Sequence, residues 1–91
     1  MKYFVYLIFS KYKNKIISYV GYTKNINKRM NLHNSSKGAK FTKGKKWILY
    51  YKEDFHSKSK AMSREYELKK DKKFRDYLKE KFMRINKNFI S

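Results

Sequence analysis

The run Tyr3 to Phe9 constrains the fold of this chain more than any other stretch. Successive side chains of a strand point to opposite faces of a sheet. In this run both faces are apolar, because Tyr3, Val5, Leu7 and Phe9 alternate with Phe4, Tyr6 and Ile8. A strand that is apolar on both faces normally lies at the centre of a sheet and is covered on both sides. The sequence therefore predicts that its first strand is the central one.

The second strand and the first helix follow from short local signals. Ile16 to Val20 is rich in β-formers and predicts an antiparallel hairpin with the first strand, which Gly21 is expected to end. Thr23 or Asn25 can then cap a helix, because either side-chain oxygen accepts a hydrogen bond from a free amide of the first turn. We expect this helix to extend to about residue 34.

The second half of the chain predicts one strand and two helices. Trp47 to Tyr51 is the expected third strand, Ser57 or Ser59 begins a helix, and a last helix covers about residues 72–85. We therefore predict a single domain over residues 1–91, with a core of about residues 3–70. Its fold class is α/β (α+β): a small three-stranded antiparallel sheet flanked by helices, in the order β-β-α-β-α-α.

The charge of the chain indicates the chemical nature of its partner. Its 25 lysine and arginine residues outnumber 7 acidic residues and give a formal net charge of +18. Such an excess favours nucleic acid as the partner. An anionic membrane surface is the second choice. The structural alternative is a lysine coat that only keeps the protein soluble, and nucleic acid is favoured over it because solubility rarely needs so large an excess of positive charge. Four lysines of the predicted loop after the first helix are candidates for contacts with backbone phosphates: Lys40, Lys43, Lys45 and Lys46.

The sequence also excludes some classes of protein. It contains no cysteine, which excludes a disulfide scaffold and a thiolate metal site. The N-terminal apolar run is too short for a signal-peptide core or a transmembrane span. We therefore expect an intracellular, cytoplasmic protein that does not enter a membrane.

Two predicted helices place polar side chains on faces that point toward the core. On the first, Arg29 and His33 lie four residues apart and share a face with apolar neighbours. On the second, Glu65 lies within an apolar stripe. A charged group at such a position needs a partner or a function. Tyr6 and Tyr19, one from each strand of the hairpin, can join these residues on one face of the sheet.

Hydrolysis of a phosphodiester has a use for each of these groups. A phenol or an imidazole can take a proton from the attacking water, and a carboxylate can hold a divalent cation. A guanidinium can neutralise the charge that develops on the phosphorus. Each residue also has a purely structural interpretation, the tyrosines as ordinary sheet aromatics and His33 as a helix-terminal histidine favoured by the dipole.

The order of short motifs along the chain resembles a known family. Val5-Tyr6-Leu7 and Tyr19-Val20-Gly21 are followed by Arg29, by Gly38-Ala39-Lys40-Phe41-Thr42 and by the segment Ala61 to Lys69. Together these motifs resemble the GIY-YIG endonuclease domain. They are similar to its small stand-alone bacterial members and to the branch that cuts Holliday junctions. The resemblance covers about residues 3–70.

The resemblance implies a role for each residue of the predicted site. The two motif tyrosines of the family fall on Tyr6 and Tyr19, its arginine on Arg29, its histidine on His33 and its metal-binding glutamate on Glu65. Members of this kind use one Mg²⁺ or Mn²⁺ ion to cut one nucleic-acid strand, which leaves a 5′-phosphate and a 3′-hydroxyl. We therefore expect an endonuclease that acts on DNA, with RNA left open, in repair or recombination. In this hypothesis Tyr19, together with His33, activates the water, and Tyr6 orients the phosphate.

Two further functions stay open at this point. One is a non-catalytic basic module that clamps nucleic acid, and the other is a regulatory protein at an anionic membrane. Cleavage that requires Mg²⁺ distinguishes the nuclease from both. We expect no small-molecule cofactor, and no feature of the sequence indicates a protein partner.

Overall fold

The computed structural model describes residues 1–86 and has the predicted order of elements. The strands and helices are β1 (Tyr3–Tyr12), β2 (Lys15–Thr23), α1 (Ile26–Asn34), the 3₁₀-helix η1 (Lys40–Thr42), β3 (Ile48–Phe55), α2 (Lys58–Lys70) and α3 (Lys72–Ile85). The prediction of an α+β fold with a three-stranded antiparallel sheet is confirmed.

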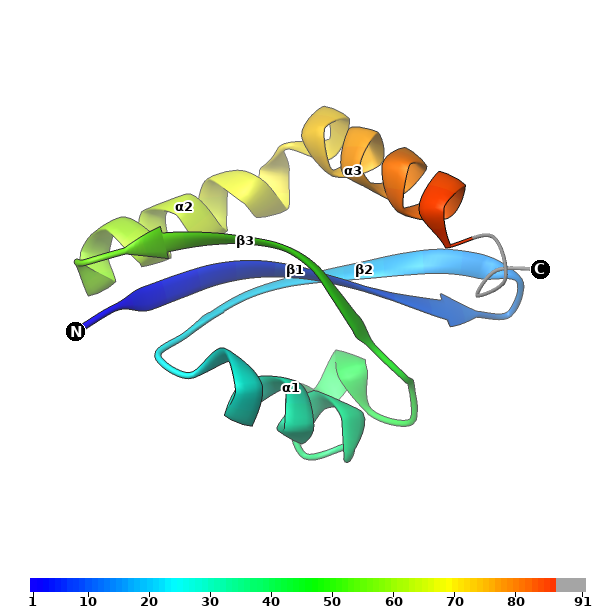
Figure 1. Ribbon diagram of the computed structural model, residues 1–91, viewed down its shortest axis with the longest axis horizontal. Coiled ribbons are helices and arrows are strands. Elements are labelled where there is room, and N and C mark those ends of the chain that lie inside the picture. The colour runs from blue at the N-terminus through cyan, green and yellow to red at the C-terminus, as the bar shows by residue number, and fades with distance from the viewer. Residues whose placement is uncertain (87–91) are drawn as a thin grey trace.

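Strand β1 lies at the centre of the sheet, as its sequence predicts. The strand order is β2-β1-β3, and both strand pairs are antiparallel. Each residue from Val5 to Phe9 is at most 1% exposed. Helices cover both faces of the sheet, α2 and α3 on one side and α1 on the other (Figure 1). The alternating side chains of β1 are therefore divided between two separate cores.

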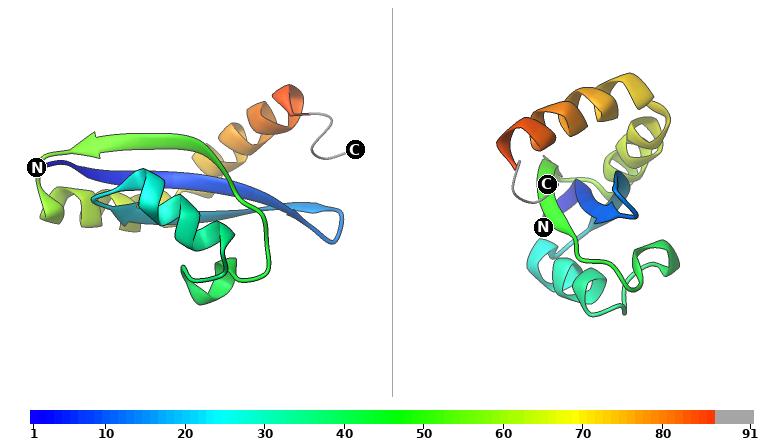
Figure 2. Two further views of the ribbon diagram at one scale, coloured as in Figure 1. Left: turned by 60° about the horizontal axis from the view of Figure 1, so that its bottom comes forward. Right: turned by 90° about the vertical axis from the view of Figure 1, so that its right-hand side faces the viewer.

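The two cores differ in size and in chemistry. The core beneath α2 and α3 is apolar, and its buried members are Val5, Leu7, Phe9, Ile16, Val20, Ala61, Leu68, Leu78 and Phe82. The core on the other face is smaller and is built around Tyr6, Ile8 and Trp47. The right-hand view of Figure 2 shows the sheet between these layers, with α2 and α3 above it and α1 and η1 below.

The turn between β1 and β2 sets the register on which the site depends. Lys13 and Asn14 have φ values of 49° and 63°, the two positive values typical of a two-residue type I′ hairpin. In this register Tyr6 lies directly opposite Gly21, which is two residues along β2 from Tyr19. Opposed residues share a face, as do residues two apart on one strand. Tyr6 and Tyr19 therefore lie on the face that α1 covers.

Two predicted strand boundaries are wrong. Gly21 does not end β2, because the strand continues to Thr23, which pairs with Phe4. The third strand is longer than predicted and covers Ile48–Phe55, since its last residues pair with the beginning of β1. Trp47 lies just before this strand and is only 2% exposed.

Candidate functional site

The N-cap of α1 fixes the beginning of the helix that carries Arg29 and His33. The Asn25 side-chain oxygen accepts a hydrogen bond from the Lys28 amide at 3.0 Å. The Thr23 hydroxyl oxygen in turn accepts one from the Asn25 amide at 3.2 Å. Both predicted capping residues therefore take part, and Asn25 is the cap itself.

The phase of α1 turns its polar residues toward the sheet. Ile26 and Met30 pack against the core that contains Tyr6. One turn after Met30, His33 is 0% exposed, and Arg29 is partly buried. The prediction that the arginine and the histidine lie on the inward face is thus confirmed, although their chemical roles stay predictions.

A glycine allows the Tyr6 ring to lie across the neighbouring strand. A Cβ atom added at Gly21 would lie 2.5 Å from the Tyr6 Oη atom and 2.7 Å from its Cζ atom. Real Cβ atoms do not approach other heavy atoms so closely, so a side chain at this position would displace the ring. Gly21 is therefore needed for this close approach and not, as predicted, for a turn.

The rings of Tyr6, Tyr19 and His33 form one cluster. Tyr6 donates or accepts a hydrogen bond at 2.7 Å between its Oη atom and His33 Nε2. The Tyr19 ring lies 6.5 Å from the Tyr6 ring and 5.2 Å from the imidazole, centroid to centroid. The hydroxyl that contacts His33 thus belongs to Tyr6, whereas the sequence hypothesis paired His33 with Tyr19.

Thr42 is a member of the cluster that the candidate residues do not include. Its Oγ1 atom lies 2.9 Å from His33 Nδ1, and both residues are 0% exposed. Gly38 packs against the same imidazole, since a Cβ atom there would lie 2.5 Å from Nδ1. Both residues belong to the motif Gly38 to Thr42. The motif was the only feature of the sequence that could have pointed to them, because no periodic pattern places them in the site.

Burial and neighbouring groups set the protonation states of the cluster. Burial raises the pKa of Tyr6 to about 12; Arg29 opposes this effect, and Tyr19 and Glu65 add to it. Burial also lowers the pKa of His33, and the positive charge of Arg29 lowers it further. At neutral pH the hydrogen bond therefore joins a neutral phenol to a neutral imidazole.

Arg29 has an unusual environment for a partly buried arginine. Interactions with the hydroxyls of Tyr6, chiefly, and of Tyr19 raise its pKa. Its Nε atom is buried and has no hydrogen-bond partner within the described part of the chain. Leaving a buried donor unsatisfied costs about 1–3 kcal/mol. A cavity of about 340 Å³ opens beside the residue, lined by Thr23, Lys24, Asn25, Lys28, Arg29 and Leu32.

The prediction that Glu65 joins the other candidates on one face of the sheet is wrong, because Glu65 belongs to the layer on the opposite face from α1. It lies on α2, which packs on β1 and on the edge strand β2. Its side chain is 19% exposed, and Lys69 Nζ lies 3.5 Å from its carboxylate. The carboxylate is near enough to raise the pKa of Tyr6. Among residues 1–86, no group of three or more histidine, aspartate or glutamate side chains could hold a metal ion.

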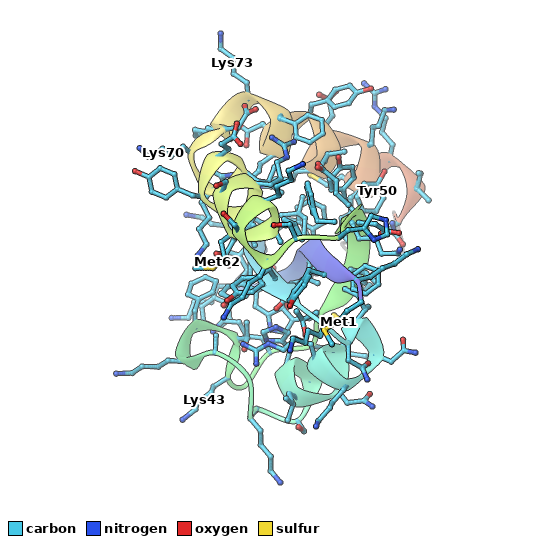
Figure 3. All side chains as sticks on the ribbon, turned by 90° about the vertical axis from the view of Figure 1, so that its left-hand side faces the viewer. Met1, Lys43, Tyr50, Met62, Lys70 and Lys73 are labelled. Carbon is cyan, nitrogen blue, oxygen red and sulfur yellow. The ribbon has the colours of Figure 1, made fainter. Side chains whose placement is uncertain are left out.

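The four predicted phosphate-binding lysines do not share one environment. Lys40, Lys43 and Lys46 are exposed around η1. The ammonium group of Lys45 instead donates hydrogen bonds to the carbonyls of Phe41 and Lys43, at 3.0 Å and 3.3 Å. In Figure 3, Lys43 and Met62 project toward the same side of the molecule, although Met62 belongs to α2 on the opposite face of the sheet.

An exposed aromatic ring lies next to the cluster. Phe41 is 51% exposed, and its ring is stacked on Tyr19 with a centroid distance of 6.4 Å and an interplanar angle of 19°. This ring therefore does not pack fully under the loop.

Over the described range, no helix is long and apolar enough to cross a bilayer.

Comparison with known proteins identifies the family of the chain. The family model described as the GIY-YIG catalytic domain matches residues 2–79. A UPF0213 protein of Staphylococcus haemolyticus is 48% identical over 69 residues, which cover 75% of this chain and 80% of that protein. A UPF0213 protein of Staphylococcus aureus is 40% identical over 70 residues, which cover 76% and 78% of the two chains.

A solved structure is also similar. The solution NMR structure of a UPF0213 protein from Bacillus halodurans has 33% sequence identity and a TM-score of 0.45, and the match covers 94% of this chain and 86% of the other. The resemblance noted from the motifs is thus confirmed by the family match and by relatives that share most of their length. The chain belongs to the GIY-YIG family of catalytic domains, a family of nucleases.

Proposed function

We propose that this protein is a metal-dependent endonuclease that hydrolyses phosphodiester bonds in DNA and cuts one strand at each site. The observation that carries the proposal is the buried hydrogen bond between Tyr6 and His33, next to Arg29 with its unpaired Nε donor. A fold alone has no use for these three polar groups in one place. A reaction that moves a proton beside a phosphate does.

Arg29 binds and neutralises the phosphate in this proposal. Its planar guanidinium presents several N–H donors in a geometry that matches phosphate oxygens. The unpaired Nε atom and the adjoining cavity, with Lys24 and Lys28 in its lining, support this role. The residue would hold the scissile phosphate next to the Tyr6 hydroxyl.

Tyr6 and His33 prepare the attacking water. His33 is neutral at pH 7, because burial lowers its pKa, so it can accept the phenolic proton. Tyr6 can then accept a proton from the water. Since the hydrogen bond to His33 is made by Tyr6, we assign proton transfer to Tyr6, and assign to Tyr19 the positioning of the phosphate or water beside it.

Glu65 would hold a divalent cation, Mg²⁺ or Mn²⁺. Mg²⁺ is commonly bound through one or two carboxylates, with waters and substrate phosphate oxygens as its other ligands, so a single glutamate is a fitting donor set. The Lys69 partner of Glu65 is itself 51% exposed, and such a surface pair is weak enough to be displaced. When bound, the cation supplies electrophilic stabilisation of the leaving oxygen.

The net charge of +18 supports DNA as the substrate. The exposed Lys40, Lys43 and Lys46 near η1 would contact backbone phosphates on the side where Phe41 lies. We further propose a role in DNA repair or recombination, inside the cell. The non-catalytic binding module keeps the same charge but predicts no cleavage.

A substitution of Glu65 tests the proposal. Glu65→Gln should reduce Mg²⁺-dependent cleavage about 100-fold or more and leave DNA binding nearly unchanged. Glu67→Gln is the matched control, because it removes the same charge from an exposed position on the same helix. Cleavage of flaps, forks, junctions and plain duplex is measured with Mg²⁺, Mn²⁺ or EDTA. Cleavage that persists in EDTA or in Glu65→Gln would contradict the metal role, and binding without any cleavage would favour the module.

A further inference from the structure

A series of three hydrogen bonds runs from Tyr6 through His33 and Thr42 to the backbone of the loop after α1. Tyr6 Oη lies 2.7 Å from His33 Nε2, and His33 Nδ1 lies 2.9 Å from Thr42 Oγ1. Thr42 Oγ1 then donates to the Ala39 carbonyl at 2.8 Å. Tyr6 is 1% exposed, and His33 and Thr42 are 0% exposed, so water does not compete for the two bonds of His33; the bond to Ala39 is partly buried.

The last hydrogen bond of the series, from Thr42 to the Ala39 carbonyl, determines which nitrogen of His33 carries the hydrogen. A carbonyl oxygen can only accept, so the single hydrogen of the Thr42 hydroxyl is used by Ala39. Toward His33 the hydroxyl oxygen can then only accept, which requires a hydrogen on Nδ1. A neutral imidazole with its hydrogen on Nδ1 has a lone pair on Nε2. The Tyr6 hydroxyl must therefore donate to His33.

We propose that Thr42 is a positioning residue that fixes His33 as the Nδ1–H tautomer, so that Nε2 faces Tyr6 as a proton acceptor. This inference rests on the proposed function for its catalytic meaning, but the tautomer itself does not depend on it. With the opposite tautomer, Nε2 would carry a hydrogen and could not accept the phenolic proton. The direction of proton transfer is thus set by a residue that does not touch the substrate.

The proton balance of the proposed step is simple. The attacking water gives a proton to Tyr6 Oη while the original phenolic proton passes to His33 Nε2. The water oxygen forms a bond to phosphorus, the bond from phosphorus to the 3′-oxygen breaks, and the leaving oxygen takes a proton from solvent. His33 is then an imidazolium with both nitrogens as donors, toward Tyr6 and Thr42, and it later returns its proton to solvent.

The surrounding structure holds Thr42 in place from its backbone. The Trp47 indole donates to the Thr42 carbonyl at 3.0 Å. Trp47 is itself bound to Asn34, the last residue of α1, through its amide at 2.6 Å and its carbonyl at 3.2 Å. Gly38 leaves no space between the loop and the imidazole. The loop that carries Thr42 is therefore tied to the helix that carries His33.

The Thr42→Val and Thr42→Ser variants test the proposal. Valine keeps the shape of threonine but has no hydroxyl, whereas serine keeps the hydroxyl. The nitrogen that carries the hydrogen is measured by two-bond ¹H–¹⁵N correlation of the imidazoles at a pH where they are neutral. The chain has only two histidines, so the exposed His56 provides an internal control and His33→Gln assigns the signals.

We expect the Nδ1–H form in the wild-type protein and in Thr42→Ser, and a shift toward the Nε2–H form in Thr42→Val. Cleavage by Thr42→Val should fall about 10- to 100-fold in kcat with KM unchanged, and Thr42→Ser should restore it. An Nε2–H form in the wild-type protein would overturn the proposal, even if the valine variant failed to fold. Full activity of a folded Thr42→Val would also overturn it. If the wild-type protein does not cleave DNA, the proposed function fails while the tautomer measurement stands.

Discussion

The two faces of the sheet use the same central strand for different purposes. On one face, Val5, Leu7 and Phe9 meet an apolar core beneath α2 and α3. On the other, Tyr6 of the same strand meets His33 and the loop that carries Thr42, and polar atoms are buried next to aromatic rings. One face thus supplies most of the apolar burial, and this leaves the other face free to carry groups that a core would exclude.

Two arginines on opposite sides of the sheet differ in the same way, one serving stability and the other the candidate site. Arg64 on α2 donates to Glu53 from Nε and from Nη2, each at 3.0 Å, and Glu53 also accepts from the Tyr51 hydroxyl. Arg29 on α1 has an unpaired Nε donor beside a cavity. An arginine whose donors are used within the protein stabilises the fold, whereas Arg29 keeps one donor unpaired and can offer it to a ligand.

The largest effect on stability is expected in the apolar core. Phe82 is 0% exposed, and its ring lies 4.7 Å from Phe9 and 5.6 Å from Tyr50. Phe82→Ala should lower the free energy of unfolding by about 3–5 kcal/mol, because it removes buried area and leaves a cavity. Urea denaturation measures the change. A loss below about 1 kcal/mol would mean that this face does not supply the main core.

The two arginines should respond in opposite ways to the same substitution. Arg29→Lys keeps the charge but loses the planar donor geometry, so cleavage should fall about 100- to 1000-fold with little change in stability. Arg64→Lys should leave cleavage nearly unchanged and lower stability by about 1–3 kcal/mol, because Glu53 loses its two-point partner. Both variants are measured by cleavage and by thermal unfolding. Equal effects on cleavage would remove the distinction between the faces.

Gly21→Ala should affect stability and function together. The added methyl group would collide with the Tyr6 ring, and such overpacking costs about 1–3 kcal/mol. The displaced hydroxyl should also lose its bond to His33, so cleavage should fall as well. Gly44→Ala is the control: a Cβ atom there meets no atom within 4 Å, although its φ of +71° makes that position strained. Because alanine at Gly44 adds backbone strain of its own, the control is made by NMR, where only Gly21→Ala should alter the His33 signals.

The smallest effect is a dependence of stability on pH. The folded pKa of His33 lies below the usual value of 6.5, owing to burial and to Arg29, so the unfolded chain binds more protons between these two values. Stability should therefore be complete above pH 6.5 and fall as the pH decreases through the folded pKa, by at most about 1.4 kcal/mol per pH unit. Tyr6 stays neutral in this window, because burial raises its pKa to about 12. A His33→Gln variant should lack the slope, and an unchanged slope would contradict its assignment.

Glu53 also makes a pH-dependent contribution to stability, which is lost at a lower pH than that of His33. Burial acts to raise the pKa of Glu53, but hydrogen bonds from Arg64 and Tyr51 outweigh it and lower the pKa below the usual 4.5. The stability that depends on this carboxylate is therefore present above pH 4.5 and is lost only as the pH falls through its folded pKa.

The fold was predictable where burial leaves a pattern along the chain. The apolar alternation of β1 predicts the central strand, and the helical phase of Arg29 and His33 predicts their inward face, because both depend on neighbours in sequence. The boundary at Gly21 was wrong because glycine is a common turn signal, whereas here the Tyr6 ring from another strand requires it.

The internal arrangement of the site was less predictable, for a related reason. The pairing of His33 with Tyr6, not Tyr19, depends on the register set by the turn at Lys13 and Asn14. Thr42 reaches the imidazole only because the loop is tied to α1 through Trp47. Such contacts join segments that are far apart in the sequence and leave no periodic pattern in it. The sequence therefore shows the motif that contains Thr42 but not the role of Thr42 in the site.

The most direct measurement compares one hydroxyl on each face. Tyr6→Phe removes the oxygen that bonds to His33, and Tyr50→Phe removes a hydroxyl from a ring that packs on the apolar core. Cleavage of the DNA panel with Mg²⁺ should fall about 10²- to 10⁴-fold in Tyr6→Phe, with DNA binding retained, and should stay at the wild-type rate in Tyr50→Phe. A Tyr6→Phe protein that cleaves at the wild-type rate would contradict the account.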